Sequence, residues 1–429
     1  MKRSLKTLSL LLLGALLLFA MGPASGQGVR LVSLFVTFGG SELNALRQGL
    51  DAFTSATGIE VIVEQSREII PILRTRVAGG NPPDVALVPR PGVVAEYARL
   101  GAIFPLVNAD GSDGIMSAET LHANYSQGLI DVGVVDGVVY GLMAKANSKS
   151  TVWYKPASLA ALGFSVPSTW DELIAITNAY RAAGKTPWSI GGQDGWTLTD
   201  WFENIYVRVA GPENYLRLFV THEIEWTDPS VVEAMNLFRQ IIRPEENLAG
   251  GAEGSLSRGF IDAANLVFRP DAGAELYYEG GFIGGIVSAN FPDLRPGEDF
   301  TAFLFPAIRP EYGRPVVGGG DLLVAYRDTP EVREFFNFVA GTEFATIWAA
   351  TGAIVSPNRN VDPSVYTVLA ALDAGQVANA EAFVFDGSDL APSALGGDAM
   401  FTGLQDFVSN PDQLTEILQF LEDVADANY

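Results

Sequence analysis

The amino-acid sequence predicts an α/β fold, and three observations point to that class. Between residues 31 and 101, short apolar runs alternate with amphipathic segments that end at glycine. After Gly141 the pattern changes, and the chain becomes rich in tryptophan and in helical segments separated by glycine turns. A chain of 429 residues is also long enough for two domains, each with a sizeable core.

The first part of the chain contains three strand–helix pairs. Each strand is a run of apolar residues, and each following helix carries an apolar stripe that stops near a glycine. The predicted strands are 31–38, 59–63 and 84–88, and the helical stripes span 43–53, 69–77 and 93–100. Successive pairs of this kind form a parallel sheet covered by helices.

In such a sheet, ligands bind beyond the carboxyl ends of the strands. This rule nominates the polar residues that follow the predicted strands as binding residues. They are Ser41, Glu42, Glu64 and Arg90. Ser41 also suits the N-cap of the first helix, so both roles stay open for it.

Short segments in the middle of the chain predict a hairpin and then a helix start. Asp136 and Gly137 lie between two apolar runs, which is typical of a β-hairpin turn. A further apolar run at 151–154 ends in two aromatic residues. Thr169 and Glu172 then have the spacing of a capping box, which predicts that a helix begins there.

The rest of the chain is predicted to be mostly helical, with a return to the sheet. The predicted elements are helices at 230–242, 331–349 and 414–424 and strands at 300–305 and 316–326. The last helix has the apolar spacing of a docking helix. The segment 277–282 is interpreted as the end of a helical stretch that stops at two glycines.

The first 26 residues have the composition of an export signal. Three basic residues precede an apolar run at 8–20, which is too short for a comfortable membrane span. Small residues at 24–26 suit cleavage before Gln27, and the alternative is an uncleaved anchor helix. No later segment is long and apolar enough to cross a bilayer, so the body is expected outside the cytoplasm.

The chain contains no cysteine, which bears on its location. A lipoprotein anchor requires a cysteine at the cleavage point, so we expect no lipid tether. Without disulfides, an exported chain must be stabilised by its core alone. The periplasm of a cell with two membranes is therefore the expected location.

The formal net charge of −23 at pH 7 limits the partners of the chain. Such an acidic body repels nucleic acid and anionic lipid, so we expect no nucleic-acid partner. It also disfavours anionic ligands, unless local arginines override the field. Neutral or cationic small molecules suit it better.

Several short segments occur in an order that resembles a known family. They are GGNPPD at 79–84, GAIFPL at 101–106, YG at 140–141, WYK at 153–155, PSTWDEL at 167–173, EGGF at 279–282 and TGAIVSPN at 351–358. Together they resemble the extracellular solute-binding proteins of carbohydrate ABC importers. The segment FDGSDL at 385–390 looks most like the α-glucoside branch of that family.

The resemblance implies a periplasmic-binding-protein-like fold of two α/β lobes, joined by a hinge, with the ligand cleft between them. The first lobe would comprise 27–145 and 316–355, and the second 146–315 and 356–429. Closure about the hinge would trap a sugar and present the closed form to the permease subunits in the membrane. The resemblance also implies a monomer without a cofactor.

A sugar site needs flat aromatic side chains for the faces of the ring and planar polar groups for its hydroxyl rim. Trp196 lies with Asp194 in a polar glycine loop that offers little local core, which favours stacking on a ligand. Gly281 stands where the family often has an acidic or amide residue. The surrounding family segment faces the cleft, which implies binding roles for Tyr278, Glu279 and Phe282.

Further candidates each have a structural alternative. Gly320 and Asp321 close a glycine run that lets a ligand approach the backbone, although Asp321 also suits a turn cap. Lys145 and Arg359 lie at the proposed crossings, where each binds the ligand, solvent or a carboxylate partner. Asp386 pairs with sugar hydroxyls or shapes a turn.

Two other functions remain compatible with the sequence. A secreted glycoside hydrolase needs two carboxylates across the scissile bond, and 50 acidic residues make such pairs unavoidable. The chain lacks the G-x-S-x-G, H-E-x-x-H and P-loop patterns, and we nominate no catalytic residue. The other alternative is the same fold with a polyamine, metal ion or peptide ligand. His122 and His222 are isolated, so no metal site is expected.

Overall fold

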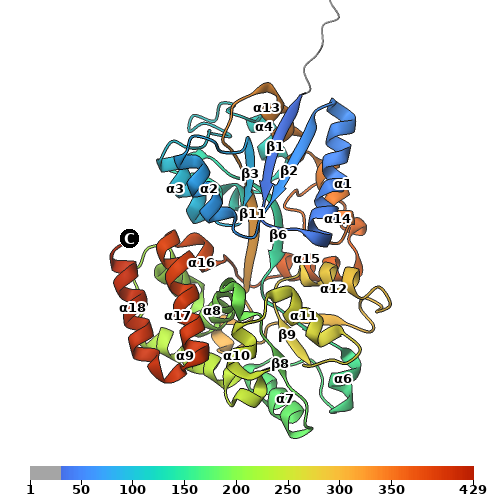
Figure 1. Cartoon of the computed structure of the whole chain (residues 1–429), viewed down its shortest axis with the longest axis vertical. Coiled ribbons are helices and arrows are strands. Elements are labelled where there is room, and N and C mark those ends of the chain that lie inside the picture. Colours follow the sequence, from blue (N-terminus) through green and yellow to red (C-terminus); the bar gives the residue numbers. More distant parts are fainter. Residues whose placement is uncertain (1–29) are drawn as a thin grey trace, which may run out of the picture.

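The computed structural model describes residues 30–429 and arranges them in two α/β lobes, which lie one above the other in Figure 1. The expected fold class is confirmed. The larger sheet has six strands: five follow the order β12-β11-β3-β1-β2, and β6 pairs with β11. These strands are β1 (Leu31–Val36), β2 (Glu60–Gln65), β3 (Val85–Val88), β6 (Leu142–Ser148), β11 (Val316–Ala325) and β12 (Phe383–Phe385).

The three predicted strand–helix pairs are present in the upper lobe. The helices are α1 (Gly40–Thr57), α2 (Ile69–Ala78) and α3 (Pro91–Arg99). β1 pairs in parallel with both β2 and β3. α1 ends at Gly58, whose φ of 70° lies in the left-handed region that glycine adopts without steric cost. The carboxyl ends of the three strands therefore meet at one edge, which points toward the lower lobe (Figure 1).

β6 and β11 run between the two lobes (Figure 1). All of β11 is buried, and it pairs in antiparallel fashion with β3 on one side and β6 on the other. Val317, near its start, packs in the core of the lower lobe. Leu323, near its end, packs in the core of the upper lobe. A single strand is thus shared by both cores.

The lower lobe contains a four-stranded sheet with the order β10-β7-β9-β8. Its strands are β7 (Thr151–Tyr154), β8 (Trp188–Ser189), β9 (Leu276–Tyr278) and β10 (Thr301–Leu304). The predicted helical stretch before the glycines at 280–281 is wrong, because Tyr277 and Tyr278 lie in β9. This aromatic segment pairs with β7 and β8, and such residues suit a pleated, buried surface.

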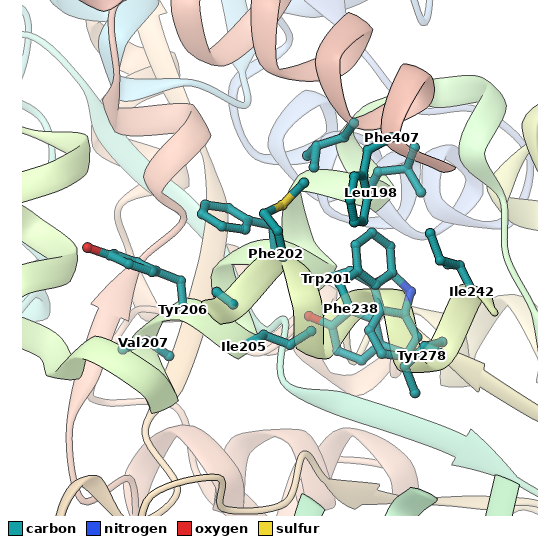
Figure 2. Close-up of a cluster of buried hydrophobic side chains, with 14 of the residues drawn as sticks. Leu198, Trp201, Phe202, Ile205, Tyr206, Val207, Phe238, Ile242, Tyr278 and Phe407 are labelled. Atoms are coloured by element: carbon teal, nitrogen blue, oxygen red, sulfur yellow. The ribbon is translucent and has the colours of Figure 1, made fainter. Parts of the chain in front are cut away.

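Most of the tryptophans belong to the core of the lower lobe rather than to a surface. Figure 2 shows Trp201 of α8 (Trp196–Phe219) among aromatic neighbours from other elements. Its ring stacks on Phe238 of α9 (Pro229–Ile242) at 5.6 Å and lies 4.5 Å from the ring of Tyr278. Packing of this kind binds α8 and α9 to the sheet without any disulfide.

The two local signals in the middle of the chain are confirmed. Asp136 and Gly137 connect β4 (Val134–Val135) and β5 (Val138–Val139), and both have positive φ, as a tight hairpin turn requires. Thr169 and Glu172 form the complete capping box of α7 (Trp170–Ala182). The remaining helices of five residues or more before residue 300 are α4 (Ala118–Asn124), α5 (Gln127–Asp131), α6 (Pro156–Ala161), α10 (Gly251–Leu256), α11 (Phe260–Phe268) and α12 (Ile283–Asn290).

The predicted helix at 331–349 is in fact two helices, α13 (Pro330–Val339) and α14 (Thr342–Ala350). Gly341 has extended backbone angles and is the N-cap of α14, so the chain turns between them. Both apolar stripes reach the same core, which explains why the sequence pattern looked continuous. The last helices are α15 (Val368–Ala378), α16 (Gly387–Leu390), α17 (Met400–Ser409) and α18 (Leu414–Asp426).

α18 is the predicted docking helix, and its apolar residues pack into the core of the lower lobe. Among residues 30–429, no helix has the length and apolar character needed to span a membrane. The predicted signal peptide at 1–26 lies outside the described residues.

Candidate functional site

A cavity of about 730 Å³ lies between the two lobes. The upper lobe contributes the first turn of α1, the start of α2 and the segment after β3. The lower lobe contributes the starts of α8, α11 and α17. Eight predicted residues line this cavity together: Glu42, Arg90, Lys145, Asp194, Trp196, Phe282, Gly320 and Asp321.

Lys145 occupies the middle of β6 and is held by groups of the upper lobe. Its Nζ lies 2.9 Å from Asp321 Oδ2 and 3.5 Å from Glu42 Oε1, and 4.6 Å from the ring centre of Phe38. Burial opposes the charge on Lys145, but the attraction of Asp321 and Glu42 outweighs it and raises the pKa of the ammonium. Lys145 therefore stays charged.

Lys149 lies four residues further along the chain and is held by groups of the lower lobe. Its Nζ is 3.1 Å from Asp200 Oδ1, contacts Asp386, and lies 5.3 Å from the ring centre of Trp196. Burial opposes its charge, but these carboxylates raise the pKa of Lys149 well above its usual range. Burial also opposes the charge on Asp386, yet Lys149 lowers the pKa of that carboxyl to about 2.

Two arginines of the upper lobe reach aromatic rings of the lower lobe. The Arg67 guanidinium lies 5.0 Å from the ring centre of Phe260, and its Nη2 is 3.4 Å from Glu42 Oε2. The Arg90 guanidinium lies 5.0 Å from the ring centre of Phe401, and its Nε is 3.3 Å from Asp389 Oδ1. Both side chains therefore link the two walls of the cavity.

The four cations share one arrangement, in which each is paired with a carboxylate and lies over an aromatic ring. Their charges are largely balanced within the wall, so the cavity carries directional polar groups without a strong field of one sign. Ionised carboxylates accept hydrogen bonds from hydroxyls, while ammonium and guanidinium groups donate them. Such a wall suits a neutral ligand rich in hydroxyl groups.

Asn147 adds an unpaired donor to this wall. Its side chain is buried and lines the cavity, and its Nδ2 has no hydrogen-bond partner within residues 30–429. A buried polar group without a partner is costly, and a ligand hydroxyl would remove that cost.

Three of the predicted residues are not in the lining of this cavity and lie elsewhere on the surface or in another cavity. Ser41 lines a second cavity. Glu64 is exposed and pairs with Arg76 at 2.9 Å. Arg359 is exposed too, and its Nε donates to the carbonyl of Ala123 at 3.2 Å. The carboxyl-end rule brought Glu64 to the correct edge of the sheet, but β2 is the last strand in the sheet order and the Glu64 side chain is exposed.

The other three predicted residues outside the lining are buried behind it. The Tyr278 hydroxyl donates to the Lys149 carbonyl at 2.6 Å. Glu279 is fully buried, and burial raises the pKa of its carboxyl to about 8, against the attraction of Lys149. Asp386 caps α16 by accepting from the Asp389 backbone N–H, and it also holds Lys149. These residues support the wall from behind.

Sequence reasoning missed several lining residues. Asn147 and Lys149 line the cavity together with the predicted Lys145, and the spacing of two from the middle of β6 to the residue after its end is a strand signal that would have identified them as one set. Phe260 and Phe401 stand at or near the starts of helices, far apart in sequence. No local pattern marks those two rings, because only the tertiary fold brings them to the cavity.

His222, expected to be isolated, lies beside an acid, with its Nε2 3.3 Å from Glu422. Asp426 lies near the same ring, and a second acidic group comprises Asp200, Glu203 and Asp386. Lys149 already supplies a positive charge to that second group. Neither cluster lines the cavity between the lobes.

Relatives with sequence similarity belong to one class of binding protein. The chain is 34% identical over 388 residues to the osmoprotective compounds-binding protein GgtB of Synechocystis sp., and the match covers 89% of each chain. It is 33% identical over 371 residues to the alpha-glucosides-binding periplasmic protein AglE of Rhizobium meliloti, which covers 83% of this chain and 78% of AglE.

Solved structures with the same fold include the bacterial solute receptor AcbH, described as having an exclusive preference for β-D-galactopyranose. Its TM-score is 0.81 at 18% identity, with 93% of this chain and 99% of AcbH covered. Maltose-bound MalE3 of T. maritima has a TM-score of 0.75 at 16% identity, covering 93% of this chain and 100% of MalE3. The model of the family described as bacterial extracellular solute-binding protein matches residues 39–346. This chain therefore belongs to the bacterial extracellular solute-binding proteins.

Proposed function

We propose that this chain is the periplasmic solute-binding protein of a carbohydrate ABC importer. Its ligand would be an α-glucoside or a related di- or oligosaccharide, which it delivers without chemical change to the membrane permease. The main support for this proposal is the cavity between the lobes. Its charged side chains are paired with one another within the wall, and aromatic rings lie beside them, which suits a neutral sugar. The relative AglE is named for binding alpha-glucosides and the relative GgtB for binding osmoprotective compounds, and these names favour a ligand of this class.

The proposal includes a division of the chain into two closing lobes. The first comprises 27–145 and 316–355, and the second comprises 146–315 and 356–429, with residues 1–26 as the export signal. The division at residues 145–146 falls within β6, and β11 begins at Val316, next to the second boundary. Closure would bring the two walls of the cavity together around the sugar.

Calorimetry on the purified mature protein tests the ligand class. We expect saturable binding of maltose or trehalose, and a dissociation constant near ~1 μM would correspond to about −8 kcal/mol. Chromatography of the same mixtures should recover the sugars intact. Sustained cleavage would instead favour a glycoside hydrolase, and tight binding of spermidine or iron without any sugar would favour a different ligand.

Trp196 provides the sharper test of the site. Its indole is half-buried at the start of α8, beside Lys149, and its ring centre lies 5.2 Å from that of Phe260. We expect Trp196→Ala to weaken sugar binding at least tenfold, or about 1.4 kcal/mol, because a stacking face is lost. Trp196→Phe keeps a flat ring and should lose much less affinity.

Both Trp196 variants need a matched measurement of the fold. Circular dichroism and thermal melting should be close to those of the wild type, since the indole is not part of the deepest core. Unchanged affinity in Trp196→Ala, with the fold intact, would remove this residue from the site.

A further inference from the structure

Two buried carboxyl groups lie next to each other behind the aromatic part of the main cavity. Asp200 belongs to the second turn of α8, and Glu279 directly follows the last residue of β9. Neither side chain is exposed, and the two are within hydrogen-bonding reach of one another. Two ionised carboxylates can only accept hydrogen bonds, so a bond between this pair requires that one of them carries a proton.

The other contacts of the pair leave one oxygen on each side chain for this bond. Asp200 Oδ1 lies 3.1 Å from Lys149 Nζ, and Glu279 Oε2 accepts from the Gly280 N–H at 3.0 Å. Within residues 30–429, Asp200 Oδ2 and Glu279 Oε1 have no donor. A buried polar atom without a partner is costly, and a single proton between these two atoms would satisfy both.

The charges around the pair favour keeping that proton. Titratable groups face the pair from α8, from α16, from β9 and from the residue after β6; they are Glu203, Asp386, Asp389, Tyr277, Tyr278 and Lys149. Lys149 is the only cation among these groups, and it already pairs with Asp386. A second negative charge on the pair would therefore be buried without a counter-charge. Burial accordingly raises the pKa of both carboxyls, that of Glu279 to about 8, against the attraction of Lys149.

The pair also connects the two segments that carry rings of the ligand site. Trp196 lies one helical turn before Asp200 on the same side of α8. Phe282 follows Glu279 closely and is the N-cap of α12. Both rings line the cavity, and their centres are 6.2 Å apart. A hydrogen bond between Asp200 and Glu279 thus joins the bases of the two segments that present these rings.

We propose that Asp200 and Glu279 share one proton, and that this bond positions Trp196 and Phe282 at the spacing that the ligand needs. The proposal rests on the proposed function, because it takes the two rings as part of a sugar site. When the proton leaves for solvent, the two carboxylates repel each other and the segments that carry the rings separate. Both carboxyls are positioning residues, since they act on the ligand through the rings.

The direction of the pH effect follows from the raised pKa. The shared proton is present below about pH 8 and is lost above it. Only the protonated fraction of the protein would be competent to bind, so the apparent affinity falls as that fraction falls. We therefore expect calorimetry with maltose or trehalose to show at least fivefold weaker binding at pH 9.5 than at pH 6.5.

Glu279→Gln is the decisive variant. Its amide keeps an oxygen that can accept from Gly280 and adds an N–H that can donate to Asp200, which imitates the protonated pair at every pH. Its sugar affinity should change by less than twofold between pH 6.5 and pH 9.5. Asp373→Asn is the matched control: Asp373 of α15 is a buried carboxyl with a pKa raised to about 7, but it does not line the cavity. This control should keep the wild-type fall in affinity.

Carbon-13 NMR of protein labelled at the glutamate carboxyls tests the shared proton without any ligand. We expect one resonance, absent from Glu279→Gln, to titrate near pH 8. A resonance that is fully ionised from pH 5 upward would overturn the shared proton. Wild-type affinity that is flat with pH, or an equal fall in Glu279→Gln, would overturn the positioning role. If the wild type binds neither sugar, the proposed α-glucoside specificity fails, whereas the titration still confirms or overturns the shared proton.

Discussion

At the scale of single residues, Gly281 has no room for a side chain. A Cβ on Gly281 would overlap the Asp373 carboxyl. Asp373 is buried and accepts from the Ser148 N–H at 2.8 Å, so it cannot move aside without losing that bond. A side chain at position 281 and the Asp373 carboxyl would therefore compete for the same space.

Gly281→Ala should destabilise the protein by about 2 kcal/mol, since a methyl group in a filled space forces the structure to shift. The loss is measured by urea unfolding. In an Asp373→Ala background the same substitution should cost nearly nothing, which is the coupling expected for two residues in contact. Gly375→Ala is the control: nothing lies within 4 Å of the added Cβ, so it should be neutral or stabilise α15 slightly. Additive effects of the two substitutions would contradict the overlap.

The predictability of the site also differs from residue to residue. Glu42 and Arg90 follow strands of a parallel sheet, so a general geometric rule was enough to bring them to the cavity. Trp196 was found because an indole in a glycine loop has little core nearby. Phe401 carries no such signal, since its place opposite Arg90 depends on how α17 packs against the rest of the lower lobe. Local rules identify chain ends and loops, but not partners that only folding brings together.

At the scale of elements, strands and helices with strong periodicity were predicted well, and errors occurred where tertiary pairing decides. β1, β2 and β3 appear as expected, because apolar runs bounded by turns have few alternatives. The segment around Tyr278 was misassigned, since three residues of strand carry too little periodicity to be distinguished from a helix end. The break at Gly341 was missed because α13 and α14 both direct apolar residues into one core.

α15 is joined to the end of β6 by a buried carboxyl, and this gives a prediction for pH. Burial raises the pKa of Asp373 to about 7, although the Ser148 N–H opposes that shift. In the unfolded chain the same group has a pKa near ~3.9. Between these values the unfolded state releases the proton and the folded state keeps it. The contribution of Asp373 to stability is thus fully present below about pH 4 and is lost as pH rises toward 7.

Asp373→Asn removes this dependence while keeping an oxygen that accepts from Ser148. We expect the unfolding free energy of the variant, relative to the wild type, to increase by up to about 4 kcal/mol between pH 4 and pH 8. Denaturant unfolding at pH 4, 6 and 8 measures the difference. Other buried acids also titrate, but they contribute equally to both proteins. Parallel curves for the two proteins would show that Asp373 is ionised in the native state.

At the scale of the whole molecule, the two lobes share β11 and meet again at Arg90. The strand fixes one side of the cleft, whereas Arg90 reaches from the segment after β3 to Asp389 and Phe401 of the lower lobe. Its guanidinium lies against Gly397, where a Cβ would collide with it. The Arg90 side chain is only 9% exposed, so this contact between the two lobes is largely desolvated. Arg90 should therefore stabilise the closed form specifically.

Arg90→Ala should shift the ligand-free protein toward the open form, because it removes contacts that only the closed form makes. Small-angle X-ray scattering should then give a larger radius of gyration than the wild type without ligand. Sugar affinity should fall about tenfold, since closure then costs part of the binding free energy. Arg74→Ala is the matched control: Arg74 lines the same cavity, but its ion pair with Glu96 at 3.5 Å stays within the upper lobe. If the scattering curves of Arg90→Ala and the wild type were superimposable with and without saturating maltose, Arg90 would not control closure. The shared strand β11 would then be the main determinant of the relative orientation of the two lobes.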